Sequence, residues 1–280
     1  MRHQRYWFVS RFCLLFIPLA VTVVITLLPI LWALVTSLKF EKDVMSAIIH
    51  YLPSPATLEN YARVWSVNKF FVYFRNSLFI SLLSVIFITF LAICNGYALS
   101  RFKFKGKKLF MLFLLGTQLI PIVILIIPLF LVFKTVRLIN NPLGIILFYI
   151  MIQTPFCTLL MKGFIDGVPR QIDEAALVEG ASWRQVIFGL ITPVILPGIV
   201  AVTAFAFIGC WNEFLVAFSF ITSSRLFTIP IGLQFMIGEF SVEYASLAAG
   251  SVISLIPPLL IFAYVQKYLV AGLSSGSVKG

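Results

Sequence analysis

The chain has 280 residues, of which 61% are hydrophobic and only 11% are charged, and its formal net charge is +11. Soluble domains are roughly 45–50% apolar and about 25% charged, and a soluble fold of this length could not bury so much apolar surface. The composition therefore excludes soluble enzymes, disordered regulators and disulfide-stabilised scaffolds, and it indicates an integral membrane protein.

Basic residues, histidines and cysteines are placed in ways that exclude other classes of site. The basic residues lie between apolar runs and not on one face interleaved with aromatic residues, so we expect no nucleic-acid partner. His3 and His50 form no cluster, and we expect no metal site. The cysteines are widely spaced within apolar stretches, which predicts inert thiols and neither a zinc site nor a disulfide framework. They are Cys13, Cys94, Cys157 and Cys210.

Six charge-free apolar runs are each long enough to cross a bilayer as a helix, which takes about 20 residues. In chain order they are 12–38, 76–100, 109–133, 138–161, 185–212 and 244–266. The runs are continuously apolar, without the alternation of a barrel strand, so they predict helices. A seventh run, Leu226–Gly238, is short and contains Pro230, which predicts a re-entrant or interfacial loop. The predicted fold is all-α, one transmembrane domain over 1–280 with six spanning helices.

Basic residues in the short loops predict the orientation, because Lys and Arg accumulate on the cytoplasmic side. With the N-terminus inside, 13 of the 21 Lys and Arg residues are cytoplasmic, including the cluster Arg101–Lys108 after the second run. We interpret this cluster as an anchor of the topology. Both termini are then expected in the cytoplasm. The first run is longer than the apolar part of a signal peptide, so we expect it to stay in the mature protein.

The loop 162–184, between the fourth and fifth runs, is the longest polar segment on the predicted cytoplasmic side. Pro169 suits the first turn of a helix, and Gly180 suits its end. Ser182 and Gln185 have the spacing of a capping box that would begin the fifth run. A helix of about ten residues is marginal alone in water, so we expect it to dock onto another protein.

A series of short motifs carries a resemblance to a known family. Glu174–Ala176, followed by Gly180 and Pro193, resembles the EAA loop of ATP-binding-cassette importer permeases, with Leu190 and Thr192 where that family usually has Ile and Leu. Other segments are similar, in the same order, to the carbohydrate (maltose-transporter-like) branch. They are 55–61, Gly96–Arg101, Ile127–Leu129, Trp211–Phe214 and Phe227–Leu233.

The resemblance implies a non-catalytic permease subunit in the bacterial-type plasma (inner) membrane, importing a sugar. The implied partners are a second six-span permease, a cytoplasmic ATP-binding-cassette ATPase dimer, an external sugar-binding protein and membrane lipid. The chain contains no GxxxxGK loop followed by Ser or Thr for cradling phosphates. ATP would therefore be used by the ATPase, and no cofactor would bind this chain directly.

The resemblance also implies roles for individual residues. Loop 162–184 would carry the coupling helix that sits on the ATPase, through Asp173, Glu174, Ala175, Ala176 and Gly180. Glu174 would contact basic groups of the ATPase, the alanines would allow close approach, and Gly180 would permit the turn into the fifth run. The candidates for substrate contact or a gate are Gln118, Trp211, Asn212 and Glu213. Helix–helix hydrogen bonds and interfacial aromatic anchoring are alternative explanations for these four.

The main alternative is an ion-coupled secondary transporter of a small polar solute. Such transporters place ionisable groups at the membrane midplane and are built from internal repeats. Here the runs are nearly free of charge and no repeat is evident. A membrane-embedded enzyme would need paired carboxylates or an activated nucleophile, and the runs contain no such arrangement. Co-purification with an ATPase and a second permease would separate these classes.

Overall fold

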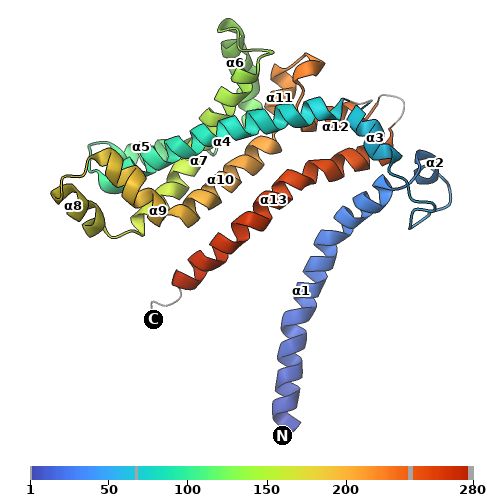
Figure 1. Cartoon of the computed structure of the whole chain (residues 1–280), viewed down its shortest axis with the longest axis horizontal. Helices are drawn as coiled ribbons and strands as arrows, with labels where there is room; N and C mark the ends of the chain where they lie inside the picture. The colour runs from blue at the N-terminus through green and yellow to red at the C-terminus, as the bar shows by residue number, and fades with distance from the viewer. Residues whose placement is uncertain (1, 67–68, 239–241, 277–280) are drawn as a thin grey trace. The chain divides into compact units, whose positions relative to one another are not determined.

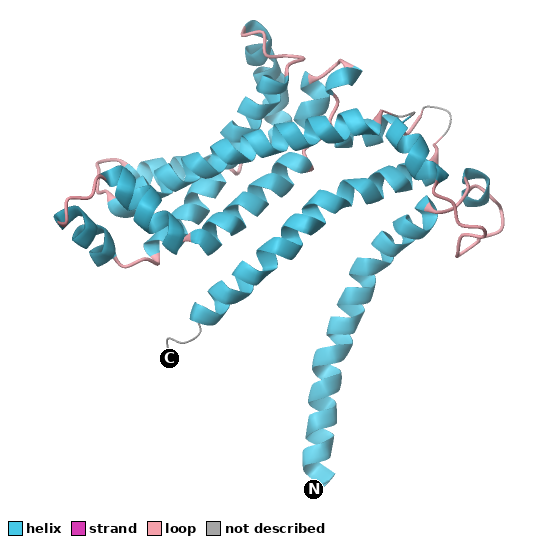
Figure 2. Ribbon diagram, in the orientation of Figure 1, coloured by secondary structure: helices cyan, strands magenta, loops and turns pink. Residues whose placement is uncertain are grey.

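The computed structural model describes the backbone of residues 2–66, 69–238 and 242–276, and the side chains of 14–66, 69–238 and 242–268. The expectations for His3 and Cys13 therefore lie outside the described side chains. Within the described backbone the regular structure is helical (Figure 2), apart from an isolated bridge between Ile237 and Val242. The all-α prediction is confirmed.

The chain divides into two units. The first unit comprises residues 1–70 and 233–255, and the second comprises residues 71–232 and 256–280. The last helix, α13 (Tyr244–Gly276), begins in the first unit and ends in the second.

In the first unit, α1 (Arg2–Ser37) is followed by α2 (Glu41–Val44) and α3 (Glu59–Ser66). The amide of Asn60 donates hydrogen bonds to the carbonyls of Ser37 and Lys39, at 2.8 and 2.7 Å. These bonds satisfy acceptors that the end of α1 leaves without intrahelical partners. The carboxylate of Glu41 accepts the N–H groups of Tyr244 and Ala245, at 2.8 and 2.9 Å, which caps the start of α13.

The second unit contains the remaining helices. In chain order they are α4 (Phe70–Arg101), α5 (Lys107–Thr117), α6 (Ile122–Thr135), α7 (Pro142–Asp166), α8 (Arg170–Val178), the π-helix η1 (Gln185–Ile191), α9 (Thr192–Val194), α10 (Leu196–Trp211), α11 (Leu215–Phe220), the 3-10 turn η2 (Ser224–Leu226) and α12 (Ile229–Phe235). Helices α4, α7 and α10 lie side by side (Figure 1). The Thr89 and Thr203 hydroxyls are 3.1 Å apart between α4 and α10, and Phe156 of α7 packs on Phe205 of α10.

Among the described residues, four helices are long and apolar enough to span a membrane: Leu14–Ser37 of α1, α4, α7 and Tyr244–Tyr268 of α13. The predicted runs 109–133 and 185–212 are not straight helices. The first bends by 98° between α5 and α6, and the second bends by 86° before α10. Each bent pair counts as one broken span or a re-entrant loop, so the six-helix count stays a prediction.

A proline stands at each bend, where it donates no backbone hydrogen bond and its ring disfavours a straight continuation of the preceding helical turn. Pro121 stands at the N-cap of α6, and Pro197 lies in the first turn of α10. The run Leu226–Gly238 forms only η2 and the seven-residue helix α12, which is too short to span.

Candidate functional site

The loop between α7 and η1 contains a short helix, as the sequence predicts. Helix α8 ends before Gly180, whose φ of +90° lies in the left-handed region that favours glycine. Pro169 is the N-cap residue of α8 and lies one position before its expected place in the first turn. The expected capping box is present, because the Ser182 N–H donates to Gln185 Oε1 at 2.8 Å.

One detail of this segment differs from the expectation. The residues after the capping box form the π-helix η1 and not the start of a straight α-helix. The Thr192 hydroxyl donates to the Ile187 carbonyl five residues earlier, at 2.8 Å, which stabilises the wide turn. Single π-helical turns are frequent at functional sites.

The two sides of α8 have different surroundings. Asp173 is buried, with its side chain 6% exposed, and it forms an ion pair with Arg101 at the end of α4. Glu174, Ala175 and Gly180 are exposed, and Ala176 is half-buried. Of the five expected coupling residues, Asp173 therefore faces the protein, whereas Glu174 and Ala175 are available to a partner.

Sequence reasoning missed the residues of α4 that hold α8. Arg101 appeared only as a member of a basic cluster and as the end of the motif Gly96–Arg101, with no contact to the loop expected, yet its guanidinium also donates to the Val168 carbonyl at 2.9 Å. The Arg170 guanidinium donates to the Ser100 carbonyl at 2.9 Å. The sequence feature that could have indicated these contacts is the motif Gly96–Arg101, which precedes the loop by more than sixty residues.

Three of the four substrate or gate candidates lie together at the end of α10. Trp211 is 2% exposed and contacts Phe74 of α4 edge-on at 5.6 Å. Asn212 is the C-cap residue of α10 and is exposed. A buried Trp211 offers no open aromatic surface for a sugar ring in this conformation.

The third member of this group, Glu213, is tied to neighbouring elements. Its carboxylate accepts the Tyr149 hydroxyl at 3.1 Å and the N–H groups of Val216 and Ala217 at 2.8 and 3.1 Å. Burial raises the pKa of the Glu213 carboxyl above its ordinary value, and these hydrogen bonds oppose the rise. Glu213 thus links α7 to the start of α11.

Gln118 is placed apart from this group, at the break between α5 and α6. It is exposed, and its amide lies 3.5 Å from the Ile152 carbonyl of α7. The neighbouring Gln153 packs directly against Gly209 of α10, where an added Cβ would clash with the Gln153 amide. The middle of α7 therefore contacts both Gln118, at the break between α5 and α6, and the helix α10 that ends at Trp211.

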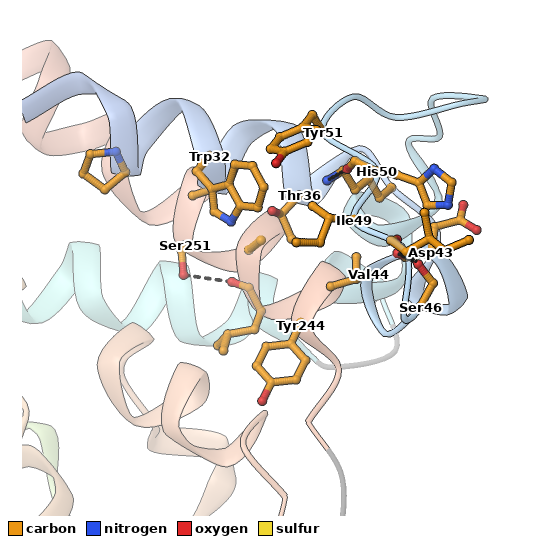
Figure 3. A pocket seen from close by; sticks show the side chains of 16 residues that line it. Trp32, Thr36, Asp43, Val44, Ser46, Ile49, His50, Tyr51, Tyr244 and Ser251 are labelled. Atoms are coloured by element: carbon orange, nitrogen blue, oxygen red, sulfur yellow. Dashed lines mark hydrogen bonds between the residues drawn. The ribbon is translucent and has the colours of Figure 1, made fainter. Parts of the chain in front are cut away.

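A cavity of about 560 Å³ lies in the first unit where α1 ends (Figure 3). The rings of Trp32 and Tyr51 meet edge-on at 6.4 Å, and Lys39 Nζ lies 4.8 Å from the Trp32 ring centre. Asp43 and Tyr244 also line the cavity. Aromatic surface with a few polar groups is typical of small-molecule sites. The sequence did not indicate this cavity, because its lining comes from two distant segments.

The chain is similar in sequence to known transport proteins. A family model described as "Binding-protein-dependent transport system inner membrane component" matches residues 88–275. The chain is 31% identical over 265 residues to the sulfoquinovosyl glycerol transport system permease protein SmoH of Agrobacterium fabrum, covering 95% of this chain and 93% of that protein. It is 31% identical over 271 residues to the trehalose/maltose transport system permease protein MalG of Thermococcus litoralis, covering 95% and 96%.

Solved structures share the fold. A bacterial ABC transporter involved in the import of the acidic polysaccharide alginate contains a chain that matches with a TM-score of 0.82 and 21% identity, covering 96% of this chain and 98% of that one. A bacterial alginate ABC transporter in complex with an alginate pentasaccharide-bound periplasmic protein matches with a TM-score of 0.65 and 18% identity, covering 93% and 95%.

Proposed function

Because this chain belongs to the family of binding-protein-dependent transport system inner membrane components, we propose that it is one of two permease subunits of an ATP-driven sugar importer. An external binding protein would deliver the sugar, and a separate ATPase dimer would supply the energy. The names of SmoH and MalG support a saccharide as the solute. The fold shared with the alginate transporters is compatible with this assembly.

The observation that carries the proposal is helix α8. It is a short helix held on one side, through Asp173, and open on the other, where Glu174 and Ala175 are exposed and Val178 is 88% exposed. A small apolar side chain beside a carboxylate suits a groove with basic and apolar walls on another protein. The ATPase would occupy this side, and ATP would bind there and not on this chain.

The proposed orientation places α8 and both termini in the cytoplasm. The basic cluster Arg101–Lys108 supports this orientation, because short cytoplasmic loops are rich in Lys and Arg. The external binding protein would then dock at the opposite membrane face.

The proposed solute contacts are fewer than the sequence indicated. Gln118 and Asn212 are exposed and can donate and accept hydrogen bonds from hydroxyl groups. Trp211 and Glu213 are already engaged with α4, α7 and α11. We therefore assign Trp211 and Glu213 to a gate that holds the end of α10, and Gln118 and Asn212 to contact with the sugar.

The test is transport by the complete complex in proteoliposomes, with a panel of radiolabelled mono- and oligosaccharides. We expect uptake of at least one sugar with ATP and none with a non-hydrolysable analogue. Glu174→Lys should abolish this uptake while the two permeases still co-purify, whereas Glu179→Lys, just beyond α8, serves as the matched control. Uptake driven by a proton or sodium gradient without ATP would favour the ion-coupled alternative and overturn the proposal.

A further inference from the structure

We propose that α4 transmits movement between α8 and the end of α10, and that Arg101 is the positioning residue that fastens α8 to α4. This inference rests on the proposed function of α8 as the element moved by an ATPase. It assigns the transmission to a helix that is distant from α8 in the chain, and not to the segment that directly follows α8.

Helix α8 is attached at two points on one face. Arg170 and Asp173 are three residues apart, so their side chains lie on the same side of α8. Arg170 donates to the Ser100 carbonyl, and Asp173 pairs with Arg101. Because both partners belong to the last turn of α4, α8 cannot rotate about its own axis without breaking one of these contacts.

Helix α4 also holds the chain on both sides of α8. Before α8, the Ser100 hydroxyl donates to Asp166 Oδ1 at 2.6 Å, and Arg101 donates to the Val168 carbonyl. After α8, the ring of Trp183 packs on Phe102 at 5.1 Å and on Tyr97 at 6.4 Å. The end of α4 therefore contacts the segments before, within and after α8.

The ion pair between Arg101 and Asp173 is buried. The side chains of Arg101 and Asp173 are 7% and 6% exposed. Among the described residues, the Asp173 carboxylate has no hydrogen-bond donor other than its ion-pair partner Arg101. Removing Arg101 would leave a buried, unpaired carboxylate, which is strongly unfavourable. Asp173 would then turn toward water, and α8 would lose its fixed orientation.

Two routes lead from α8 to the end of α10. The route along the backbone passes Gly180 in a left-handed conformation, the π-helix η1 and the 86° bend before α10. The other route is α4, an uninterrupted helix of 32 residues. At about 1.5 Å per residue, some 40 Å separate Arg101 from Phe74, whose ring packs on Trp211. A continuous helix transmits a displacement better than a backbone route that is interrupted by a left-handed residue, a π-helix and a bend.

Close packing keeps α4 aligned along this route. An added Cβ on Gly96 would lie 3.0 Å from the Lys162 backbone nitrogen and 3.1 Å from Met161 Cβ, so α4 and α7 are in direct contact near α8. Further along, Thr89 of α4 contacts Thr203 of α10. The helix is therefore supported by neighbours between its two ends.

The primary test measures the sugar transported per ATP hydrolysed in the reconstituted complex, using the saccharide of the panel that wild-type protein takes up fastest. Arg101→Gln should lower this ratio about tenfold, within the usual range of coupling between sites, and Arg101→Lys should lower it less. Lys105→Gln, an exposed neighbour, is the matched control. The exchange Arg101→Asp with Asp173→Arg should restore part of the ratio, which a loss of folding alone would not allow.

A spectroscopic test needs no sugar. Nitroxide labels at the exposed positions Lys103→Cys and Glu179→Cys should report one distance, unchanged between the nucleotide-free complex and the complex trapped with ATP and vanadate. With Arg101→Gln added, the distance should change with nucleotide. If wild-type protein shows no ATP-dependent uptake, the proposed function fails. If it shows uptake, but Arg101→Gln alters neither the ratio nor the distance, only the inference about α4 is overturned.

Discussion

At the residue scale, two glycines of the same helix differ in the space around them. A Cβ on Gly144 of α7 would clash with the Leu138 carbonyl oxygen, which belongs to backbone and cannot move aside cheaply. Gly144→Ala should therefore lower the free energy of unfolding by about 1–3 kcal/mol through overpacking. Gly163, also in α7, has open space around its Cβ position. Gly163→Ala should be neutral or stabilise the helix by up to about 1 kcal/mol.

A thiol-reactive dye measures this difference, because Cys157 and Cys210 are buried and become reactive when the protein unfolds. Purified variants would be heated in detergent while the fluorescence of the dye is followed. Equal midpoints for Gly144→Ala and Gly163→Ala would contradict the packing between α7 and the turn at Leu138.

Glu213 gives a prediction about pH. Because burial raises the pKa of its carboxyl in the folded chain, the folded state binds this proton more tightly than the unfolded state. The contribution of Glu213 to the free energy of unfolding is therefore fully present at pH values below the pKa of this carboxyl in the unfolded chain. It is lost as the pH rises through the pKa in the folded chain. The midpoint of thermal unfolding would be measured at a series of pH values across the weakly acidic range. In Glu213→Gln protein, the midpoint should fall less steeply with rising pH than in wild-type protein. An identical slope in wild-type and Glu213→Gln protein would exclude Glu213 as its source.

Single residues also show where sequence reasoning stops. An ATPase contact requires Glu174 and Ala175 to be accessible, and both are exposed. Asp173 was grouped with them because it is adjacent in the chain, but it faces α4. Its partner Arg101 is distant in sequence, and a local pattern carries no information about such a pairing. The burial of Trp211 by Phe74 has the same origin.

At the element scale, the turn after α8 depends on the backbone conformation of Gly180. A Cβ added there would meet nothing within 4 Å, but the φ of +90° is strained for residues with a side chain. Gly180→Ala should therefore reduce ATP-dependent uptake without reducing co-purification of the complex. Gly180→Asn should retain more uptake, because Asn tolerates the left-handed region better than other residues. Equal uptake by the two variants would show that backbone strain at this turn does not matter.

The elements that the sequence predicts best are those set by local chemistry. Apolar runs of sufficient length marked the regions of α1, α4, α7 and α13, and the capping box at Ser182 and Gln185 marked the start of η1. The bends between α5 and α6 and before α10 were not predicted as breaks. A proline permits a bend, but contacts with neighbouring helices also decide whether an apolar run stays straight. The hydropathy of a run carries no information about those contacts.

At the scale of the whole molecule, membership in the permease family confirms the expectation of a non-catalytic transport subunit in the inner membrane. The division of the chain into two units is a result that composition could not provide, because the units are defined by contacts between residues that are distant in the chain. The structure also shows that the described part of α1 buries none of its most apolar window within this chain. Such a helix needs lipid or another subunit around it, in agreement with a chain that works as part of a complex.

The sidedness of the molecule leads to the last prediction. If short basic loops lie in the cytoplasm, α8 must be accessible from inside, and the loop before α3 must be accessible from outside. Single cysteines at Val178 and Ile48, which are 88% and 72% exposed, would be introduced into a chain whose own cysteines are replaced. A membrane-impermeant thiol reagent should label Ile48→Cys in intact cells and Val178→Cys only in inverted vesicles, prepared from cells that lack the ATPase so that α8 is uncovered. Labelling of Val178→Cys in intact cells would place α8 outside, where no cytoplasmic ATPase could reach it.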